Sequence, residues 1–212
     1  MITNKNCIIR LSRYKNALYR LKDLGFVKVF SDNLADAIDV TSSQVRKDFS
    51  IFGLSGNKRG GYKIEELLDK MNNILGKNEV QKVILAGKGK LGTALIKYKG
   101  FEKEGIRIVA CFDNDPAKLN PEADIPVLAL EDIKEFIKKQ NIKVGIIAVP
   151  EAGAQSVADE MISGGIKGIL NFAPIKLKEK EGCVINNVNL EIELENLIYF
   201  VNIIEKTKVT KN

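Results

Sequence analysis

The chain has 212 residues, 45% apolar and 28% charged, which excludes wholesale disorder and suits one large domain or two small ones. It contains no histidine, which excludes Ser-His-Asp triads, Cys-His pairs and histidine-bearing zinc sites. Residues 1–78 carry 14 Lys and Arg against 8 Asp and Glu, whereas the remainder carries 19 of each, so the net charge of +6 predicts a basic first domain that faces a polyanion.

Two helices are predicted at the start of the basic part. Apolar residues recur at three- or four-residue steps over residues 11–24, with cations on the intervening faces. This pattern is typical of an amphipathic helix, which we expect to end near Gly25. After a short β-branched stretch, Ser31 is expected to N-cap a second helix.

A third helix is predicted from Ser42, because Thr41 and Gln44 have the spacing of a capping box. Two short helices joined by a tight turn form a helix-turn-helix. Four side chains in the first two turns can read base edges or hold phosphates: Ser43, Gln44, Arg46 and Lys47. Two alternatives stay open, namely that Gln44 only caps its helix and that Arg46 only pairs with a nearby carboxylate.

The segment GLSGNKRGGY (53–62) places four glycines around Lys58 and Arg59. Such a turn presents two cations, and we interpret it as the wing of a winged helix, with Arg59 the better candidate for a narrow minor groove. We therefore expect residues 1–78 to form a winged-helix DNA-binding domain.

A buried strand is predicted at 80–86 and is followed by a helix-compatible stretch. Between them lies a G-x-G-x-x-G loop made of Gly87, Lys88, Gly89, Lys90, Leu91 and Gly92. A second apolar run, 106–112, ends in Asp113, 21 residues beyond Gly92. This context predicts a Rossmann-type dinucleotide site in which the glycines admit the pyrophosphate and Asp113 accepts ribose hydroxyls, favouring NAD over NADP. Lys88 and Lys90 either pair with the phosphates or point into water.

The rest of the chain alternates strands and helices, as a doubly wound parallel sheet does. Strands are predicted at 127–130, 144–150 and 166–172, and helices at 131–139 and 151–163. Ligands bind such sheets at the carboxyl ends of strands, so the candidate pocket residues are Val149, Pro150 and Asn171. The alternative is that these three are ordinary loop residues.

A terminal helix at 189–206 is apolar on more than one face and must be buried against something. Packing on its own sheet and insertion into a second subunit both fit the pattern. We expect a dinucleotide-binding domain at 79–188, the terminal helix at 189–206 and a frayed tail at 207–212.

The three cysteines, Cys7, Cys111 and Cys183, are odd in number, far apart and without C-x-x-C spacing, so we expect reduced, packed thiols and no metal site. No segment reaches the roughly 18 uncharged apolar residues of a membrane span, and the start lacks a secretory pattern. The sequence therefore predicts a cytoplasmic protein without a membrane contact.

Taken together, these motifs resemble the Rex family of bacterial redox-sensing transcriptional repressors. The resemblance runs from about Arg10 to Phe200 and is carried by RLSRY, QVRKDFSIFG, KRGGY, GKGKLG, YKGF, FDNDP, AVP, GIKGILNFAP and NVNLEIEL. It implies a homodimer with an N-terminal winged helix, a Rossmann domain that binds NADH or NAD, and a terminal helix exchanged between subunits. It also implies release of a palindromic operator when NADH binds.

Carried over by position, the resemblance implies DNA contacts at Arg46, Lys47, Lys58 and Arg59, and cofactor contacts at Gly87 to Gly92 and Asp113. Tyr98 matches a family tyrosine near the nicotinamide end. The chain departs from the family at two positions: Asn189 stands where many members have aspartate, and Asn16 where some have its arginine partner. Both ends of that charged contact are neutral here, so either the contact is rebuilt with amide hydrogen bonds or the response to NADH is weakened.

Two other functions compete with the repressor. A regulator of the same type whose NADH response is weakened or lost agrees with the two asparagines. A small NAD-dependent dehydrogenase agrees with the dinucleotide fold only, because no histidine can serve as proton donor and little chain remains for a substrate domain.

Overall fold

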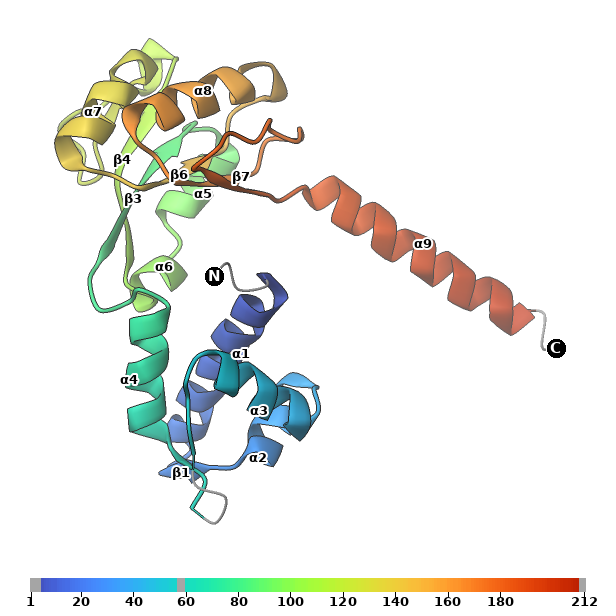
Figure 1. The fold of residues 1–212 in the computed structure, drawn as a ribbon. Helices are drawn as coiled ribbons and strands as arrows, with labels where there is room; N and C mark the ends of the chain where they lie inside the picture. Colours follow the sequence, from blue (N-terminus) through green and yellow to red (C-terminus); the bar gives the residue numbers. More distant parts are fainter. Residues whose placement is uncertain (1–4, 57–59, 210–212) are drawn as a thin grey trace. The chain divides into compact units, whose positions relative to one another are not determined.

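The computed structural model describes residues 5–56 and 60–209. The chain divides into two compact units, Met1–Glu79 and Val80–Asn212, which we call the N-terminal and the C-terminal unit (Figure 1). Each unit has its own apolar core.

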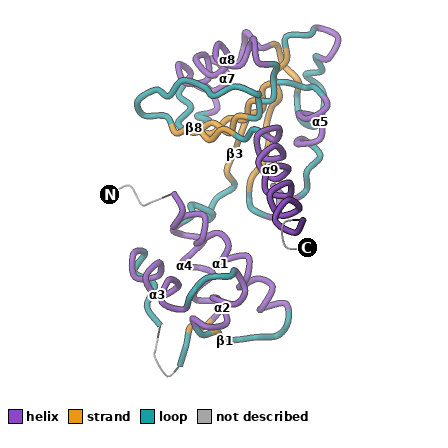
Figure 2. Tube along the Cα trace, turned by 90° about the vertical axis from the view of Figure 1, so that its right-hand side faces the viewer, coloured by secondary structure: helices purple, strands orange, loops and turns teal. Residues whose placement is uncertain are grey.

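The N-terminal unit is a winged helix. Its helix α2 packs against both α1 and α3, and α4 packs against α1 (Figure 2). A two-stranded antiparallel ribbon joins Lys28 to Lys63 and Val29 to Tyr62. The elements in chain order are α1 (Lys5–Asp23), β1 (Lys28–Val29), α2 (Ser31–Ile38), α3 (Ser42–Ile51), β2 (Tyr62–Lys63) and α4 (Ile64–Ile74).

Three aromatic rings form the centre of this unit. Phe49 of α3 packs edge-to-face on Tyr14 of α1, with ring centroids 5.3 Å apart, and on Tyr62 of β2, at 5.1 Å. Both Tyr14 and Phe49 are fully buried. The aromatic contacts therefore tie the first helix, the third helix and the ribbon into one core.

The helix ends follow local side-chain chemistry. The first helix ends before Gly25, which adopts the left-handed conformation, as expected. Thr41 caps α3, because its Oγ1 accepts from the backbone N–H of Gln44 at 3.2 Å. The prediction for Ser31 was wrong: Ser31 is the first helical residue, and the residue before it, Phe30, donates its N–H to Oδ1 of Asn33 at 2.8 Å.

The C-terminal unit contains a six-stranded parallel sheet with the strand order β5-β4-β3-β6-β7-β8. This confirms the predicted α/β class. Its strands are β3 (Gln81–Ala86), β4 (Ile106–Asp113), β5 (Val127–Ala129), β6 (Val144–Ile147), β7 (Gly168–Asn171) and β8 (Val184–Asn187). Its helices are α5 (Lys90–Ile96), α6 (Gly100–Lys103), α7 (Ile133–Gln140), α8 (Glu151–Gly164) and α9 (Leu190–Val209), with short 3-10 turns at Pro116–Lys118 and Leu130–Asp132.

Both faces of the sheet are covered, which explains the continuous apolar runs of the strands. Ile84 and Ala86 of β3 face one core with α7 and α8, and their neighbours Val83 and Leu85 face a second core with α5 and α6. Figure 1 shows α7 and α8 together on one side of the sheet.

The last helix, α9, exposes its side chains over its whole described surface, including large apolar ones such as Leu194, Ile198 and Phe200. Asn189 caps it, since its Oδ1 accepts the backbone N–H groups of Glu191 and Ile192 at 3.0 and 3.2 Å. The helix continues to residue 209, beyond the predicted end at 206. No helix within residues 5–56 and 60–209 is long and apolar enough to cross a membrane.

Candidate DNA-binding and dinucleotide-binding sites

The glycine loop lies between β3 and α5, and each glycine in it meets a different steric condition. Gly87 has φ +99°, and a Cβ there would lie 2.4 Å from the carbonyl oxygen of Ala148. A Cβ on Gly92 would lie 1.9 Å from the carbonyl oxygen of Gly87, so α5 packs directly on the loop. A Cβ on Gly89 would meet nothing within 4 Å. The loop is thus closed toward the protein at its ends and open at its middle, which suits close approach of a ligand.

A cavity of about 410 Å³ opens beside this loop at the carboxyl ends of β3, β4 and β6. Its wall is formed by Gly87, Gly89, Phe112, Asp113, Asn114, Lys118, Leu130, Ala148, Val149, Pro150, Ala152, Gly153 and Val157. The structure therefore brings together Val149, Pro150, Asp113 and two of the loop glycines. This is the edge at which open α/β sheets bind ligands.

Asp113 ends β4 and is nearly buried. Its carboxylate accepts the backbone N–H groups of Lys88 at 2.6 Å and Asp115 at 2.9 Å, and Nζ of Lys118 lies 3.2 and 3.3 Å from its two oxygens. Burial alone would raise the pKa of Asp113, but these donors together lower it below the usual value. The carboxylate is held ionised at the cavity wall, with a lysine beside it that the sequence analysis did not single out.

Other predicted cofactor residues lie elsewhere. Lys88 is half-buried and donates Nζ to the carbonyl of Lys118 at 3.5 Å, while Lys90 and Leu91 are exposed. Tyr98 is 59% exposed and packs edge-to-face on Phe101 at 5.1 Å, outside the cavity wall.

Asn171 is fully buried and lies outside the cavity wall. Its Nδ2 donates to the carbonyl of Ile175 at 2.8 Å and to Oδ1 of Asn187 at 2.9 Å, and its Oδ1 accepts the N–H of Ala173 at 3.0 Å. In this structure Asn171 fastens the loop after β7 to β8. The sequence analysis correctly predicted that Asn171 lies at the end of a strand. Its side chain there forms hydrogen bonds with the backbone of the following loop.

The helix α3 presents Ser43, Arg46 and Lys47 to solvent from its first two turns. The hydroxyl of Ser43 is hydrogen-bonded to that of Thr41 at 2.9 Å, whereas no carboxylate among the described residues is bonded to Arg46 or Lys47, so these two cations can contact a polyanion. Gln44 differs: it is half-buried and donates Nε2 to Oδ1 of Asp48 at 2.8 Å.

Asp48 is fully buried and accepts hydrogen bonds from two helices. Arg10 of α1 binds it with two nitrogens at 2.6 and 2.8 Å, and Tyr14 donates its hydroxyl at 3.0 Å. Cys7 donates its thiol at 3.4 Å. Burial alone would raise the pKa of Asp48, but the hydrogen bonds from Arg10, Gln44, Tyr14 and Cys7 lower it below the usual value. The sequence analysis missed this residue, although it lies in the QVRKD motif.

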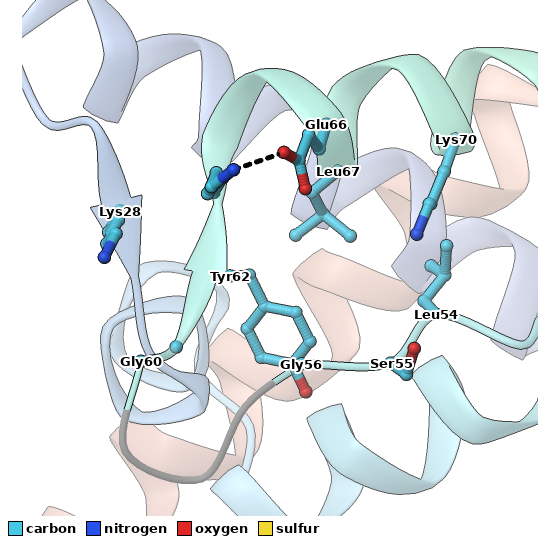
Figure 3. Close-up of a pocket in the computed structure, with 11 residues that line it drawn as sticks. Lys28, Leu54, Ser55, Gly56, Gly60, Tyr62, Glu66, Leu67 and Lys70 are labelled. Carbon is cyan, nitrogen blue, oxygen red and sulfur yellow. Dashed lines mark hydrogen bonds and ion pairs between the residues drawn. The ribbon is translucent and has the colours of Figure 1, made fainter.

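Next to the ribbon, a cavity of about 300 Å³ lies between β2, α4 and the segment after α3. Figure 3 shows the ring of Tyr62 between the backbone at Gly56 and the side chain of Leu67. A Cβ on Gly56 would come within 2.5 Å of that ring, so a larger residue at position 56 would displace Tyr62. The predicted wing cations Lys58 and Arg59 lie outside the described residues.

All three cysteines are buried. Burial raises the pKa of Cys7 and Cys183, and it raises that of Cys111 to about 11. They are packed, protonated thiols. Among the described residues no group of three or more acidic or cysteine side chains could hold a metal ion.

The fold and these sites define a class of protein in which a winged helix precedes a dinucleotide-binding type of α/β unit. Residues 5–50 match the family described as "putative DNA-binding protein N-terminus", and residues 78–175 match the "CoA binding domain" family.

The relatives identify the family. The chain is 42% identical to the redox-sensing transcriptional repressor Rex of Pelotomaculum thermopropionicum, in an alignment that covers 94% of this chain and 93% of that protein. It is 41% identical to the redox-sensing transcriptional repressor Rex of Carboxydothermus hydrogenoformans, over 91% of this chain and 93% of that protein. The crystal structure of RSP in complex with NAD+ and operator DNA, 34% identical, superposes with a TM-score of 0.92 over all of this chain and 98% of that one. RSP with NADH gives 0.85, over 98% of each chain.

The chain belongs to the Rex family of redox-sensing transcriptional repressors. Membership confirms the resemblance stated from the sequence. The dehydrogenase alternative does not hold, because the relatives that match nearly the full length are repressors and not enzymes.

Proposed function

We propose that this chain binds operator DNA through its N-terminal unit and NADH or NAD through its C-terminal unit, and that NADH releases the DNA. The observation that carries the proposal is the cavity at the glycine loop, with an ionised Asp113 at one wall and an open position at Gly89. RSP, the structural relative, has been solved with NAD+ and operator DNA and with NADH.

The residues that fit a dinucleotide are those around this cavity. Backbone amides of the loop at 87–92 would meet the pyrophosphate, and Asp113 would accept a ribose hydroxyl. Lys118 shares the Asp113 carboxylate and would lie beside the same ribose. The dinucleotide supplies the redox signal when bound, and the protein's part is to distinguish its two oxidation states.

For DNA, we assign the major-groove side chains to α3 and the minor-groove contact to the wing. Ser43, Gln44, Arg46 and Lys47 stand in the first two turns of a capped helix. The assignment of Lys58 and Arg59 to DNA is supported by the glycine-rich sequence around them and by the net positive charge of residues 1–78. Helix N-terminal turns of this kind enter the major groove in helix-turn-helix proteins. We place the protein in the cytoplasm, where both ligands are available.

We further propose a homodimer that exchanges α9, within a domain arrangement of 1–78, 79–188 and a terminal helix from 189. The apolar side chains of α9 are 44–63% exposed in the single chain, too much apolar surface for a helix in water. A second copy would cover it. A twofold dimer also presents two recognition helices, as a palindromic operator requires.

The redox signal is better assigned to the dinucleotide than to thiol chemistry. Reactive cysteines are exposed and have lowered pKa values, whereas all three here are buried and have raised ones.

A regulator with a weakened NADH response is the second candidate. Asn189 is used as the N-cap of α9, and Asn16 is an exposed amide on α1, so neither supplies a charge for a contact that changes with NADH. A weakened response would leave dinucleotide binding intact but reduce its effect on DNA.

The dinucleotide part is tested by replacing Asp113. Asp113→Ala should weaken NADH binding roughly tenfold, the effect of losing one charge-assisted hydrogen bond. It should also narrow the preference for NADH over NADPH, because Lys118 loses the nearer of its two carboxylates and keeps only Asp115, at 3.7 Å. Fluorescence titration with NADH, NAD, NADPH and ADP measures both effects.

The matched control is Asp159→Ala, which removes an exposed carboxylate of α8 paired with Lys180 at 2.7 Å. It should leave the titrations unchanged. Equal NADH affinity in the wild type and Asp113→Ala, with both folded by circular dichroism, would remove Asp113 from the site.

A further inference from the structure

The amide of Gln44 has a fixed polarity. Its Nε2 donates to Asp48, and an ionised carboxylate can only accept hydrogen bonds, so the nitrogen must be the end that faces inward. The amide oxygen lies on the other side of the same planar group and therefore points away from Asp48. A half-buried residue in the first turn of α3 thus keeps an acceptor that Asp48 does not use.

Asp48 cannot easily release this amide. It is fully buried, and its other donors, Arg10, Tyr14 and Cys7, all come from α1. Rotation of Gln44 would place its oxygen against the carboxylate and leave that buried charge with one donor fewer. Both changes are unfavourable, so the contact with Asp48 fixes the orientation of the Gln44 amide in the DNA-free protein.

Gln155 offers a useful comparison, because it makes the same contact four residues along a helix. Its Nε2 donates to Asp159 at 3.1 Å, but its Oε1 also accepts the backbone N–H of Lys178 at 2.9 Å. For Gln44, no donor among the described residues bonds to Oε1. One amide is satisfied at both ends by the protein, and the other keeps its acceptor for a partner outside it.

We propose that Gln44 reads DNA as a hydrogen-bond acceptor, with Asp48 as its positioning residue. The base edge it selects carries an exocyclic amino group in the major groove, either N4 of cytosine or N6 of adenine; guanine and thymine offer acceptors there. A free glutamine usually binds adenine through both ends. Here one of the two N–H donors is bound to Asp48, and this bond fixes which end of the amide is the oxygen, so that the acceptor contact is selected. The inference rests on the proposed DNA binding by α3.

The test begins with the duplex that the wild-type chain selects from a randomised DNA library. Affinities are then measured for duplexes changed at one base pair at a time, and for duplexes in which a cytosine or adenine is replaced by its analogue without the amino group. Removing the amino group at one position in each half-site should weaken wild-type binding by about tenfold.

Gln44→Met should bind the selected duplex about tenfold more weakly and lose this preference, so that the deamino analogue costs it nothing. The matched control Gln155→Met breaks the equivalent contact in α8 and should behave as the wild type. Asp48→Asn, used where circular dichroism shows it folded, should relax the preference at that same position because its amide can turn Gln44 around.

The inference is overturned if Gln44→Met keeps the wild-type preference at every position, or if removing an amino group costs both proteins equally. Should Asp48→Asn not fold, the analogue series with Gln44→Met still decides. If the wild-type chain selects no sequence from the library, the proposed sequence-specific DNA binding by α3 is refuted. This outcome differs from one in which a sequence is selected but Gln44→Met selects it equally well.

Discussion

Asp48 combines a charge, complete burial and contacts to two helices within a small domain. A buried carboxylate is costly unless its lone pairs are filled, and here Arg10, Tyr14, Cys7 and Gln44 fill them. Arg10 supplies the countercharge through two parallel hydrogen bonds, a geometry with strong directional preference. The result fixes the rotation of α3 against α1, and so fixes which side chains of α3 face outward.

This cluster predicts a pH-dependent stability. The pKa of Asp48 in the folded state lies below its ordinary 3.8, so the ionised carboxylate stabilises the fold above that pH, and the stabilisation is lost as the pH falls through the folded value. Asp48→Asn should lower the free energy of unfolding by about 3 kcal/mol at pH 7, because Arg10 is left without its partner. The difference from the wild type should shrink toward pH 3, measured by urea denaturation.

Glu66→Gln is the control for that measurement, since Glu66 pairs with Lys63 at 2.6 Å on the exposed surface of α4. Surface pairs contribute little, so its stability should follow the wild type at both pH values. A penalty for Asp48→Asn that is equal at pH 7 and pH 3 would contradict the assigned ionisation.

The three glycines of the loop at 87–92 have different surroundings. The sequence motif predicts that Gly87, Gly89 and Gly92 are needed, but not that each is needed for a different reason. Gly87 and Gly92 lie against backbone carbonyl oxygens, whereas Gly89 lies against open space. That distinction depends on which chain segments meet at the loop, and only the folded structure shows it.

At the level of elements, periodicity predicted most of the architecture. The helix predicted at 11–24, the helix predicted from Ser42 and the apolar strands appear close to their predicted places. Burial of one face and burial of both faces leave distinct sequence patterns. Helix α4 was missed, although Ile64, Leu67, Leu68 and Met71 have helical spacing and are buried. Strand β8 was missed because only Ile185 among its residues packs on the core.

The sites were harder to predict than the elements. The loop and Asp113 follow a motif with a physical basis, so sequence reasoning found them. Lys118 binds Asp113, five positions earlier in the chain, and Asp48 binds Cys7, 41 positions earlier. No local sequence pattern predicts such contacts. Asn171 differs, because its place at a strand end predicted a ligand contact, and its amide hydrogen-bonds within the protein to Ala173, Ile175 and Asn187.

Helix α9 carries a prediction about assembly. Because its apolar side chains are exposed in the single chain, the full-length protein should sediment at twice the mass of one chain. Leu194→Lys combined with Ile198→Lys places two charges on the proposed buried face and should give a monomer that stays folded, since neither side chain packs on the core of its own chain. Analytical ultracentrifugation measures both.

The control places the same charges elsewhere, in Val80→Lys and Val184→Lys, two exposed apolar residues outside α9. That variant should remain dimeric. A wild-type chain that sediments as a monomer across micromolar concentrations would contradict the proposed exchange of α9.

In the whole molecule, the net positive charge and the ligand cavity lie in different units. All of the net charge of +6 lies in residues 1–78, so a dimer would present twice that charge to DNA, and salt should weaken binding steeply. The C-terminal unit is neutral and provides the cavity. A change in the spacing of two recognition helices, which must lie about 34–36 Å apart, would be enough to lose one half-site.

The central claim is that the two sites are linked: if NADH favours a dimer arrangement that cannot span both half-sites, DNA must weaken NADH binding by the same factor. The most direct test is the affinity of the wild-type protein for its selected duplex at fixed salt, without dinucleotide and with saturating NADH. We predict at least a tenfold loss of affinity with NADH, which corresponds to about 1.4 kcal/mol of coupling. Equal affinities under the two conditions would contradict the account of redox sensing.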